Sequence, residues 1–146
     1  MDTYEVKCYM KKINPGIENN VFAANRIPRR VNTPFSMISN LDPDTKPGSH
    51  WVTISINENG VGEYFDSYGR KPSGHHKMFL TRNTKRWFYN NIKLQSYLTS
   101  VCGEYCLVYL YFKHKGIPML EFLKRFIDDS LCNDLLIREM FKCIFN

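Results

Sequence analysis

The segment 51–65 constrains the fold more strongly than any other part of the chain. Apolar and polar side chains alternate from Trp51 to Ile56, the pattern pauses at Asn59-Gly60, and it resumes from Val61 to Phe65. Such alternation is typical of a strand with one buried face, and Asn-Gly between two such runs is a strong signal for a β-hairpin. The sequence therefore predicts two antiparallel strands whose outer ends lie side by side.

The remaining elements are less sharply marked, and the first 40 residues are the least legible. A helix from Gly103 is indicated by apolar residues at helical spacing, and it stops near Gly116. Other expected elements are a strand at 35–38, a helix within 78–88 without fixed boundaries, a short strand at 92–94, a helix opened by Pro118 and a last helix over 131–144. Strands in the middle with helices behind them predict an α+β fold.

Length and composition limit the class of protein. The chain has 146 residues, which predicts one domain covering 1–146, and its 43% hydrophobic and 23% charged residues favour a packed core over disorder. No apolar run approaches the roughly 18 residues of a membrane span, and the N-terminus does not resemble a signal peptide. We therefore expect an intracellular monomer without membrane contact. The five cysteines, an odd number, argue against a disulfide framework.

The net charge of +6 is concentrated in one segment. Residues 67–103 contain no acid, and the rest of the chain is close to neutral. This segment is either a solvated basic surface or a surface for nucleic acid or an acidic partner. The nucleic-acid candidates are its seven basic residues, Arg70, Lys71, Lys77, Arg82, Lys85, Arg86 and Lys93.

Four residues occupy positions that suit covalent catalysis. His50 directly precedes the first hairpin strand and Asp66 directly follows the second, so pairing of the strands brings them together. Cys102 precedes the apolar helix, and Gln95 lies seven residues before it. A thiol at a helix N-terminus meets unpaired N–H groups and the positive end of the helix dipole, which favour the thiolate.

These residue types can form a complete site for acyl transfer. His50 would take the proton of Cys102 and later give it to the leaving amine, while Asp66 would orient the imidazole. Gln95 and the backbone N–H of Cys102 could donate to the oxyanion. Gly103 is expected to leave room for a substrate backbone.

Each of these residues also has a purely structural interpretation. A histidine at a strand start, an aspartate at a strand end and a cysteine at a helix start are commonly core or capping residues. Cys102 and Cys106 lie one helical turn apart, and the chain contains further histidines. No second pair follows at a spacing typical of zinc, so no metal site is expected.

Four motifs together resemble a known family. They are Gly48-Ser-His50-Trp51, Glu63-Tyr-Phe-Asp66-Ser-Tyr-Gly69, Leu94-Gln95-Ser and Ser100-Val-Cys102-Gly103-Glu-Tyr-Cys106. In this order they are similar to the motifs of the adenovirus-type (adenain-like) cysteine endopeptidases, which are relatives of the SUMO-specific and other ubiquitin-like-protein proteases. The resemblance covers most of the chain, from about residue 20 onward.

This resemblance implies a fold, an activity and a set of partners. It implies an α+β cysteine-protease fold with a small central sheet between helices, and a triad of His50, Asp66 and Cys102 with Gln95 at the oxyanion hole. It implies an endopeptidase that processes viral or virus-like transposon precursor proteins at Gly-containing sites, located in the host nucleus or the virion if viral. No cofactor is needed for the chemistry, although the family uses DNA and a peptide as activators.

The chain departs from the adenovirus enzyme at two places. Asp66 stands where that enzyme has glutamate, and the stretch 82–86 lacks the cysteine that binds its peptide activator through a disulfide. Two other functions stay open from the sequence. One is an isopeptidase that removes a ubiquitin-like modifier, and the other is a non-catalytic remnant that binds DNA or protein through residues 67–103.

Overall fold

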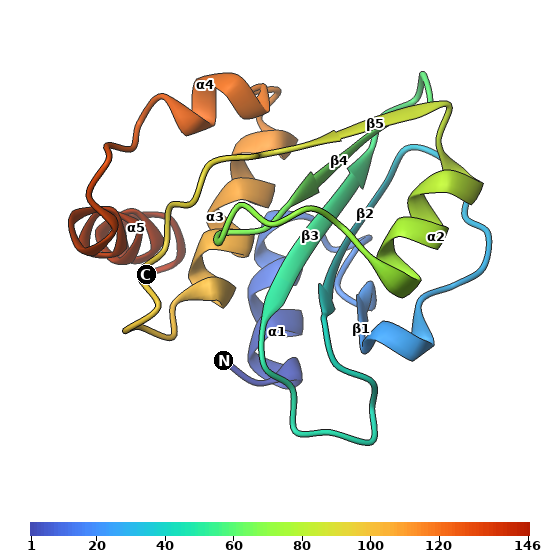
Figure 1. Ribbon diagram of the computed structural model, residues 1–146, viewed down its shortest axis with the longest axis horizontal. Helices are drawn as coiled ribbons and strands as arrows, with labels where there is room; N and C mark the ends of the chain where they lie inside the picture. The colour runs from blue at the N-terminus through green and yellow to red at the C-terminus, as the bar shows by residue number, and fades with distance from the viewer.

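A five-stranded sheet forms the centre of the computed structural model, which describes residues 1–146 (Figure 1). The three middle strands are antiparallel, and the two outer strands each run parallel to their neighbour. The strand order follows the chain: β1 (Val21–Phe22), β2 (Phe35–Asn40), β3 (Trp51–Ile56), β4 (Val61–Phe65) and β5 (Arg86–Tyr89). The predicted hairpin is confirmed as β3 and β4.

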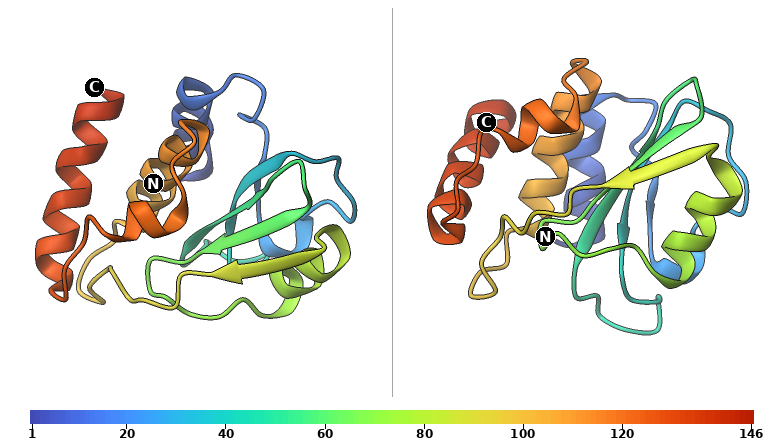
Figure 2. Two further views of the ribbon diagram at one scale, coloured as in Figure 1. Left: turned by 90° about the horizontal axis from the view of Figure 1, so that it is seen from above. Right: turned by 45° about the horizontal axis from the view of Figure 1, so that its top comes forward.

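Helices cover both faces of this sheet, with α2 on the opposite side from the others (Figures 1 and 2). The predicted α+β architecture with a central sheet between helices is thereby confirmed. No helix is long and apolar enough to span a bilayer. The helices are α1 (Thr3–Ile13), α2 (Gly74–Asn83), α3 (Cys102–His114), α4 (Met119–Leu123) and α5 (Ser130–Phe145), with a short 3₁₀ turn at Ala24–Arg26.

Side chains that alternate along the strands divide the interior into two apolar clusters. Val52, Ile54 and Ile56 of β3 pack with Phe79 and Leu80 of α2 on one face. The larger cluster on the other face joins β3 and β4 to α1, α3, α4 and α5. Helix α3 is therefore surrounded by protein, and seven of its 13 residues are buried. This burial fixes the helix that begins at Cys102.

The turn between β3 and β4 has the chemistry that its sequence predicts. Gly60 adopts a φ of +77°, which favours glycine. The side chain of Asn57 accepts hydrogen bonds from the N–H groups of Asn59 and Val61, at 3.0 Å each. The turn thus pairs Ile56 with Gly62 and sets the register of the whole hairpin.

Of two elements predicted in this region, one is confirmed in part and the other is wrong. The helix expected within 78–88 is present as α2 but ends at Asn83, where the chain turns at Thr84, whose hydroxyl donates to the carbonyl of Leu80 at 2.6 Å. Trp87 and Phe88 lie instead in β5, which pairs with β4. Residues 92–94 form no strand and run irregularly.

The N-terminal helix α1 was missed by the sequence analysis. Its signal was present: Asp2 and Glu5 form a capping box in which each side chain accepts from the other residue's backbone N–H at 2.8 Å. Val6 and Met10, four residues apart, are buried against the core. The short strand β1 was also missed, since two residues carry no readable pattern.

Candidate active site

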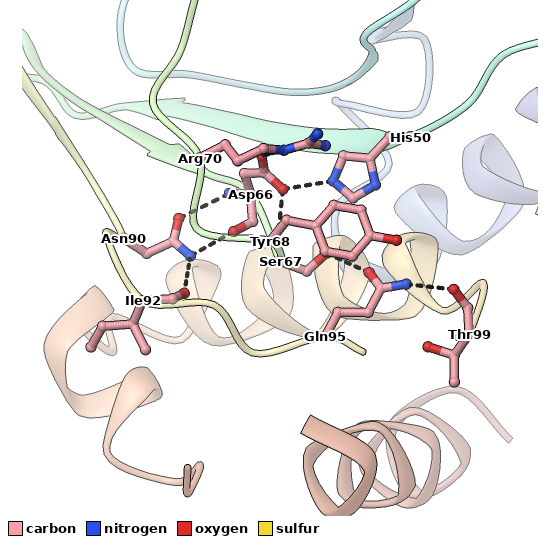
Figure 3. Close-up of polar contacts among 9 residues, drawn as sticks. All are labelled: His50, Asp66, Ser67, Tyr68, Arg70, Asn90, Ile92, Gln95 and Thr99. Carbon is pink, nitrogen blue, oxygen red and sulfur yellow. Dashed lines mark hydrogen bonds and ion pairs between the residues drawn. The ribbon is translucent and has the colours of Figure 1, made fainter. Parts of the chain in front are cut away.

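His50 and Asp66 lie together at the open end of the hairpin, as the pairing of β3 and β4 predicts. The Nε2 atom of His50 donates to Oδ1 of Asp66 at 2.6 Å, and the two side chains are 4% and 1% exposed. Figure 3 shows this contact beside the other polar contacts of the region. A hydrogen bond through Nε2 leaves Nδ1 as the ring nitrogen available for a proton-transfer partner.

Asp66 is held in place from both its side chain and its backbone. Its Oδ1 also accepts from the backbone N–H of Tyr68 at 2.8 Å, and the Nε of Arg70 approaches Oδ2 at 3.4 Å. Asn90 accepts from the N–H of Asp66 at 2.9 Å and donates to its carbonyl at 2.7 Å. Sequence reasoning missed Asn90, because it contacts Asp66 only through the parallel pairing of β4 and β5.

Cys102 is the first residue of α3 and lines the same cavity as His50. The N-cap residue, Val101, makes no capping hydrogen bond with its side chain, so no side chain occupies the N–H groups of the first turn. The cavity has a volume of about 390 Å³. Besides His50, Trp51 and Cys102, its wall includes the N-terminal residues Met1 to Thr3 and the loop between β2 and β3.

The ionisation of this group is shifted towards a thiolate–imidazolium pair. Burial raises the pKa of the Cys102 thiol, but hydrogen bonds from His50 and from the backbone of Trp51 outweigh it, so that this pKa is lowered overall. Burial lowers the pKa of His50, yet Asp66 and Cys102 raise it overall. Burial likewise opposes the charge of Asp66, and its hydrogen bond to His50 leaves its pKa below the ordinary value.

Gln95 is buried beside this group and is oriented through Ser67. The hydroxyl of Ser67 donates to Oε1 of Gln95 at 2.6 Å, and Nε2 of Gln95 donates to the carbonyl of Thr99 at 3.1 Å. The carbonyl of Ser67 also accepts from the N–H groups of Leu94 and Gln95. Because Nε2 carries two hydrogens, one remains for another acceptor.

The structure corrects the expectation for Gly103. Its missing side chain does not face open space, since a Cβ there would lie 3.0 Å from the sulfur of Met1. Trp51 is also tied to this segment, because its indole N–H donates to the carbonyl of Met1 at 3.1 Å. Gly103 thus admits the N-terminal segment to the cavity wall rather than a substrate backbone.

The seven basic residues of the segment 67–103 separate into two groups. Arg70, Lys71 and Lys93 belong to the loops beside the site. Lys77 and Arg82 belong to α2, Lys85 to the turn that follows it, and Arg86 to the start of β5. Arg82 and Lys85 line a surface hollow together with Arg30, which the charge count along the sequence did not associate with them.

The other thiols lie apart from this chemistry. All five cysteines are free. Cys106, one turn along α3, is fully buried, and burial raises its pKa well above the ordinary value. Cys8, Cys132 and Cys143 are exposed on the outer helices. No group of three or more potential metal ligands is present.

Comparison with known proteins relates the chain to cysteine proteases. A cysteine protease of African swine fever virus is 29% identical over 134 residues, which cover 83% of this chain and 48% of the relative. The crystal structure of the pS273R protease of that virus matches 75% of this chain and 42% of its own, with 27% identity and a TM-score of 0.56. The chain thus spans about half the length of this relative. No family model matches the chain.

The fold is also that of a SUMO protease. SUMO protease Ulp1, solved with its catalytic cysteine oxidised to a sulfonic acid, matches 97% of this chain and 75% of its own at 14% identity and a TM-score of 0.54. This likeness concerns the fold, and the viral protease supplies the relation in sequence. By sequence and by fold the chain is thus similar to a viral cysteine protease, and it shares its fold with a SUMO protease.

Proposed function

We propose that the protein is a cysteine endopeptidase with His50, Asp66 and Cys102 as its triad and Gln95 as an oxyanion donor. The observation that carries the proposal is the buried 2.6 Å contact between His50 and Asp66, with Cys102 at the start of α3 in the same cavity. The relation to a viral cysteine protease supports the same activity.

In the proposed reaction the thiolate of Cys102 attacks the carbonyl carbon of the scissile peptide bond. The oxyanion that forms accepts from the backbone N–H of Cys102 and from the unoccupied N–H of Gln95. His50 then gives its proton to the amine as the C–N bond breaks, which leaves an acyl-enzyme. A water molecule, deprotonated by His50, hydrolyses the thioester and restores the pair.

The substrates in this proposal are precursor polypeptides of a virus or virus-like transposon, cut at Gly-containing sites. The narrow cavity between the N-terminal segment and the loop before β3 supports small residues next to the scissile bond. DNA belongs to the proposal as an accessory partner, supported by the two basic groups.

The second candidate, an isopeptidase for a ubiquitin-like modifier, is favoured by the fold that the chain shares with SUMO protease Ulp1.

The decisive test compares Cys102→Ala with Cys132→Ala. A library of Gly-containing peptides and a ubiquitin-like C-terminal probe are incubated with each protein, with and without DNA. We expect wild type and Cys132→Ala to cleave the peptides, and Cys102→Ala to be folded and inactive. Iodoacetamide should modify Cys102 faster than the exposed Cys132, because the pKa of the Cys102 thiol is lowered whereas the Asp129 carboxylate raises the pKa of the Cys132 thiol.

Each alternative has its own outcome in this experiment. Turnover of the ubiquitin-like probe without peptide cleavage would identify an isopeptidase. Equal labelling of Cys102 and Cys132 with no turnover would identify a non-catalytic protein. Full activity of Cys102→Ala would show that the nucleophile is assigned to the wrong residue.

A further inference from the structure

Helix α5 carries a buried carboxylate, Asp134, which takes no part in the proposed triad. The residue is 2% exposed, and its two oxygens accept hydrogen bonds from two separate parts of the chain. Oδ2 accepts from the hydroxyl of Thr99 at 2.7 Å and from the backbone N–H of Ser96 at 3.2 Å. Oδ1 accepts from the hydroxyl of Tyr105 at 2.8 Å. A buried carboxylate with neutral partners contributes little to stability, so its main effect is to fix the positions of its three donors.

The Thr99 contact fixes the loop that carries Gln95. The carbonyl of Thr99 accepts from Nε2 of Gln95 at 3.1 Å, and Figure 3 shows this contact. Ser96, the other loop donor, directly follows Gln95. Asn133 of α5 adds a further link, because its Nδ2 donates to the carbonyl of Leu94 at 3.3 Å. Helix α5 therefore holds the loop on both sides of Gln95, and this determines where the remaining N–H of its side chain points.

The Tyr105 contact fixes the start of α3. The backbone N–H of Tyr105 donates to the carbonyl of Val101 at 3.1 Å. This carbonyl and the N–H of Cys102 belong to one planar peptide group, so the orientation of one sets that of the other. Burial and the hydrogen bond to Asp134 raise the pKa of the Tyr105 phenol, which therefore stays protonated as a donor. Asp134 is thus connected, through one residue, to the peptide group that carries the second proposed oxyanion donor.

On the basis of the proposed function, we propose that Asp134 is a positioning residue that sets the separation and direction of the two oxyanion donors, the side-chain N–H of Gln95 and the backbone N–H of Cys102. Stabilisation of an oxyanion depends on donors that are directed at it before the reaction, and a misplacement of about 1 Å can cost about 100-fold in rate. The two donors belong to different segments, and one carboxylate holds both segments. Asp134 acts on the reaction only through Thr99 and Tyr105.

The test removes one of these two links at a time. Thr99→Val loses the hydroxyl on the loop and keeps the carbonyl that Gln95 uses, and Tyr105→Phe loses the hydroxyl on α3 and keeps the ring. Each should lower kcat about three- to tenfold with little change in KM, which is less than the loss of a whole oxyanion donor. Thr81→Val, exposed on α2, and Tyr111→Phe, half-buried on α3, are the matched controls and should leave both constants unchanged.

A second background shows through which donor each link acts. In Gln95→Ala the loop has no donor left to position, so Thr99→Val should add little to the loss in kcat, whereas Tyr105→Phe should lower kcat by the same factor as in wild type. Thr99→Ser keeps the hydroxyl and should restore kcat towards that of wild type. The proposal is wrong if Thr99→Val lowers kcat equally in both backgrounds, or if both single variants keep the wild-type kcat while their free energy of unfolding falls.

Exchange of the Gln95 side-chain amide hydrogens with solvent, followed by NMR, measures the loop without substrate. The exchange should be faster in Thr99→Val and in Asp134→Ala than in wild type, and unchanged in Tyr105→Phe. Thr99→Val keeps the carboxylate and two of its donors, so it decides the outcome even where Asp134→Ala does not fold. A wild-type protein without peptidase activity would contradict the proposed function, whereas unchanged exchange in folded Thr99→Val would overturn the role of Asp134.

Discussion

At the scale of single residues, the carboxylate of Asp66 makes polar contacts with three different residues of the site. It accepts from the imidazole of His50 and from the N–H of Tyr68, and it faces the guanidinium of Arg70. Three donors on one buried carboxylate keep it ionised, and its pKa is lowered accordingly. An ionised Asp66 fixes which nitrogen of His50 carries the proton in the neutral ring, and it favours the imidazolium.

The shifted pKa values predict the pH range of activity. The thiolate–imidazolium pair exists above the lowered pKa of Cys102 and below the raised pKa of His50. Activity should therefore rise with pH as Cys102 loses its proton and fall as His50 loses its own. In Asp66→Asn the anion that raises the pKa of His50 is absent, so the alkaline limb should move to lower pH. We expect kcat/KM to fall by about 10- to 100-fold.

A pH profile of kcat/KM for wild type and Asp66→Asn measures this effect. Asp128→Asn, at an exposed position before α5, is a suitable control and should leave the profile unchanged. An alkaline limb that stays in place in Asp66→Asn would contradict the role given to Asp66.

Gln95 offers a prediction about the oxyanion. Gln95→Ala removes a donor and should lower kcat by about 10²- to 10³-fold with a small change in KM, since the oxyanion forms only during reaction. Ser67→Ala removes the hydroxyl that holds Oε1 of Gln95 and should cause a smaller loss. Steady-state kinetics on a cleaved peptide measures both. A raised KM with an unchanged kcat would place Gln95 in substrate binding instead.

The sequence predicts some of these residue contacts and not others. His50 and Asp66 can be placed together because a strand pair with a known turn has a fixed register. Tyr68 lies beyond the regular strands, in a turn closed by the Gly69 N–H on the Asp66 carbonyl at 2.7 Å, so its place beside His50 does not follow from strand pairing. Asn90 and Ser67 carry no sequence signal, because an amide or hydroxyl is common in any loop.

At the scale of elements, the end of β4 organises two parts of the site through consecutive residues. Asp66 orients His50, and Ser67 orients Gln95. The loop 92–95 approaches this strand end closely at Gly69, where a Cβ would lie 2.5 Å from the backbone carbon of Ile92. Helix α2 and strand β5 were harder to predict, since aromatic residues at 79, 87 and 88 fit either a helix or a strand.

Asn90 tests how far β5 supports the end of β4. Asn90→Ala leaves the buried N–H of Asp66 without a partner, while the carbonyl of Asp66 keeps the N–H of Gly69 at 2.7 Å, and it should reduce the free energy of unfolding by about 1–3 kcal/mol. The neighbouring Asn91 is exposed, so Asn91→Ala should stay within about 0.5 kcal/mol of wild type. Chemical denaturation measures the free energy of unfolding of both variants. Similar values for the two would show that the hydrogen bonds of Asn90 to the backbone of Asp66 contribute little to stability.

At the scale of the whole molecule, a buried charge joins the hairpin to α3, the helix that begins at Cys102. Glu63 of β4 accepts from the hydroxyl of Tyr109 of α3 at 2.6 Å, and its other oxygen pairs with Lys113. Glu63 lies three residues before Asp66, and Tyr109 lies two turns after Cys102. This contact therefore helps to fix α3 against the strand that carries the acid.

Glu63→Gln tests this connection. It leaves the partly buried Lys113 without its anion, and the loss should be about 3–5 kcal/mol in the free energy of unfolding. Lys142→Gln, which breaks the exposed pair with Glu139, is the matched control and should have little effect. Thermal unfolding with kcat/KM below the melting range measures stability and activity separately. A change in Glu63→Gln no larger than in the control would contradict the connection.

The distribution of charge over the molecule gives a prediction about DNA. If the basic residues of α2, β5 and the turn between them contact phosphates, the logarithm of affinity should fall linearly with the logarithm of salt concentration, by about 0.9 for each contact. Lys85→Gln with Arg86→Gln should reduce this slope by about 2. The control is Lys124→Gln with Lys142→Gln, because Lys124 lies just after α4 and Lys142 lies on α5. A slope near zero for wild type would exclude phosphate contacts by this surface.

The separation of His50, Asp66 and Cys102 along the chain has a consequence for the order in which the protein folds. His50 and Asp66 are brought together by a short-range hairpin, whereas Cys102 reaches them only when α3 docks on the sheet. Contacts between near neighbours in sequence form faster than distant ones. The proposed triad is therefore complete only once α3 has docked on the sheet, and a partly unfolded chain lacks the activated thiol on which the proposed hydrolysis depends.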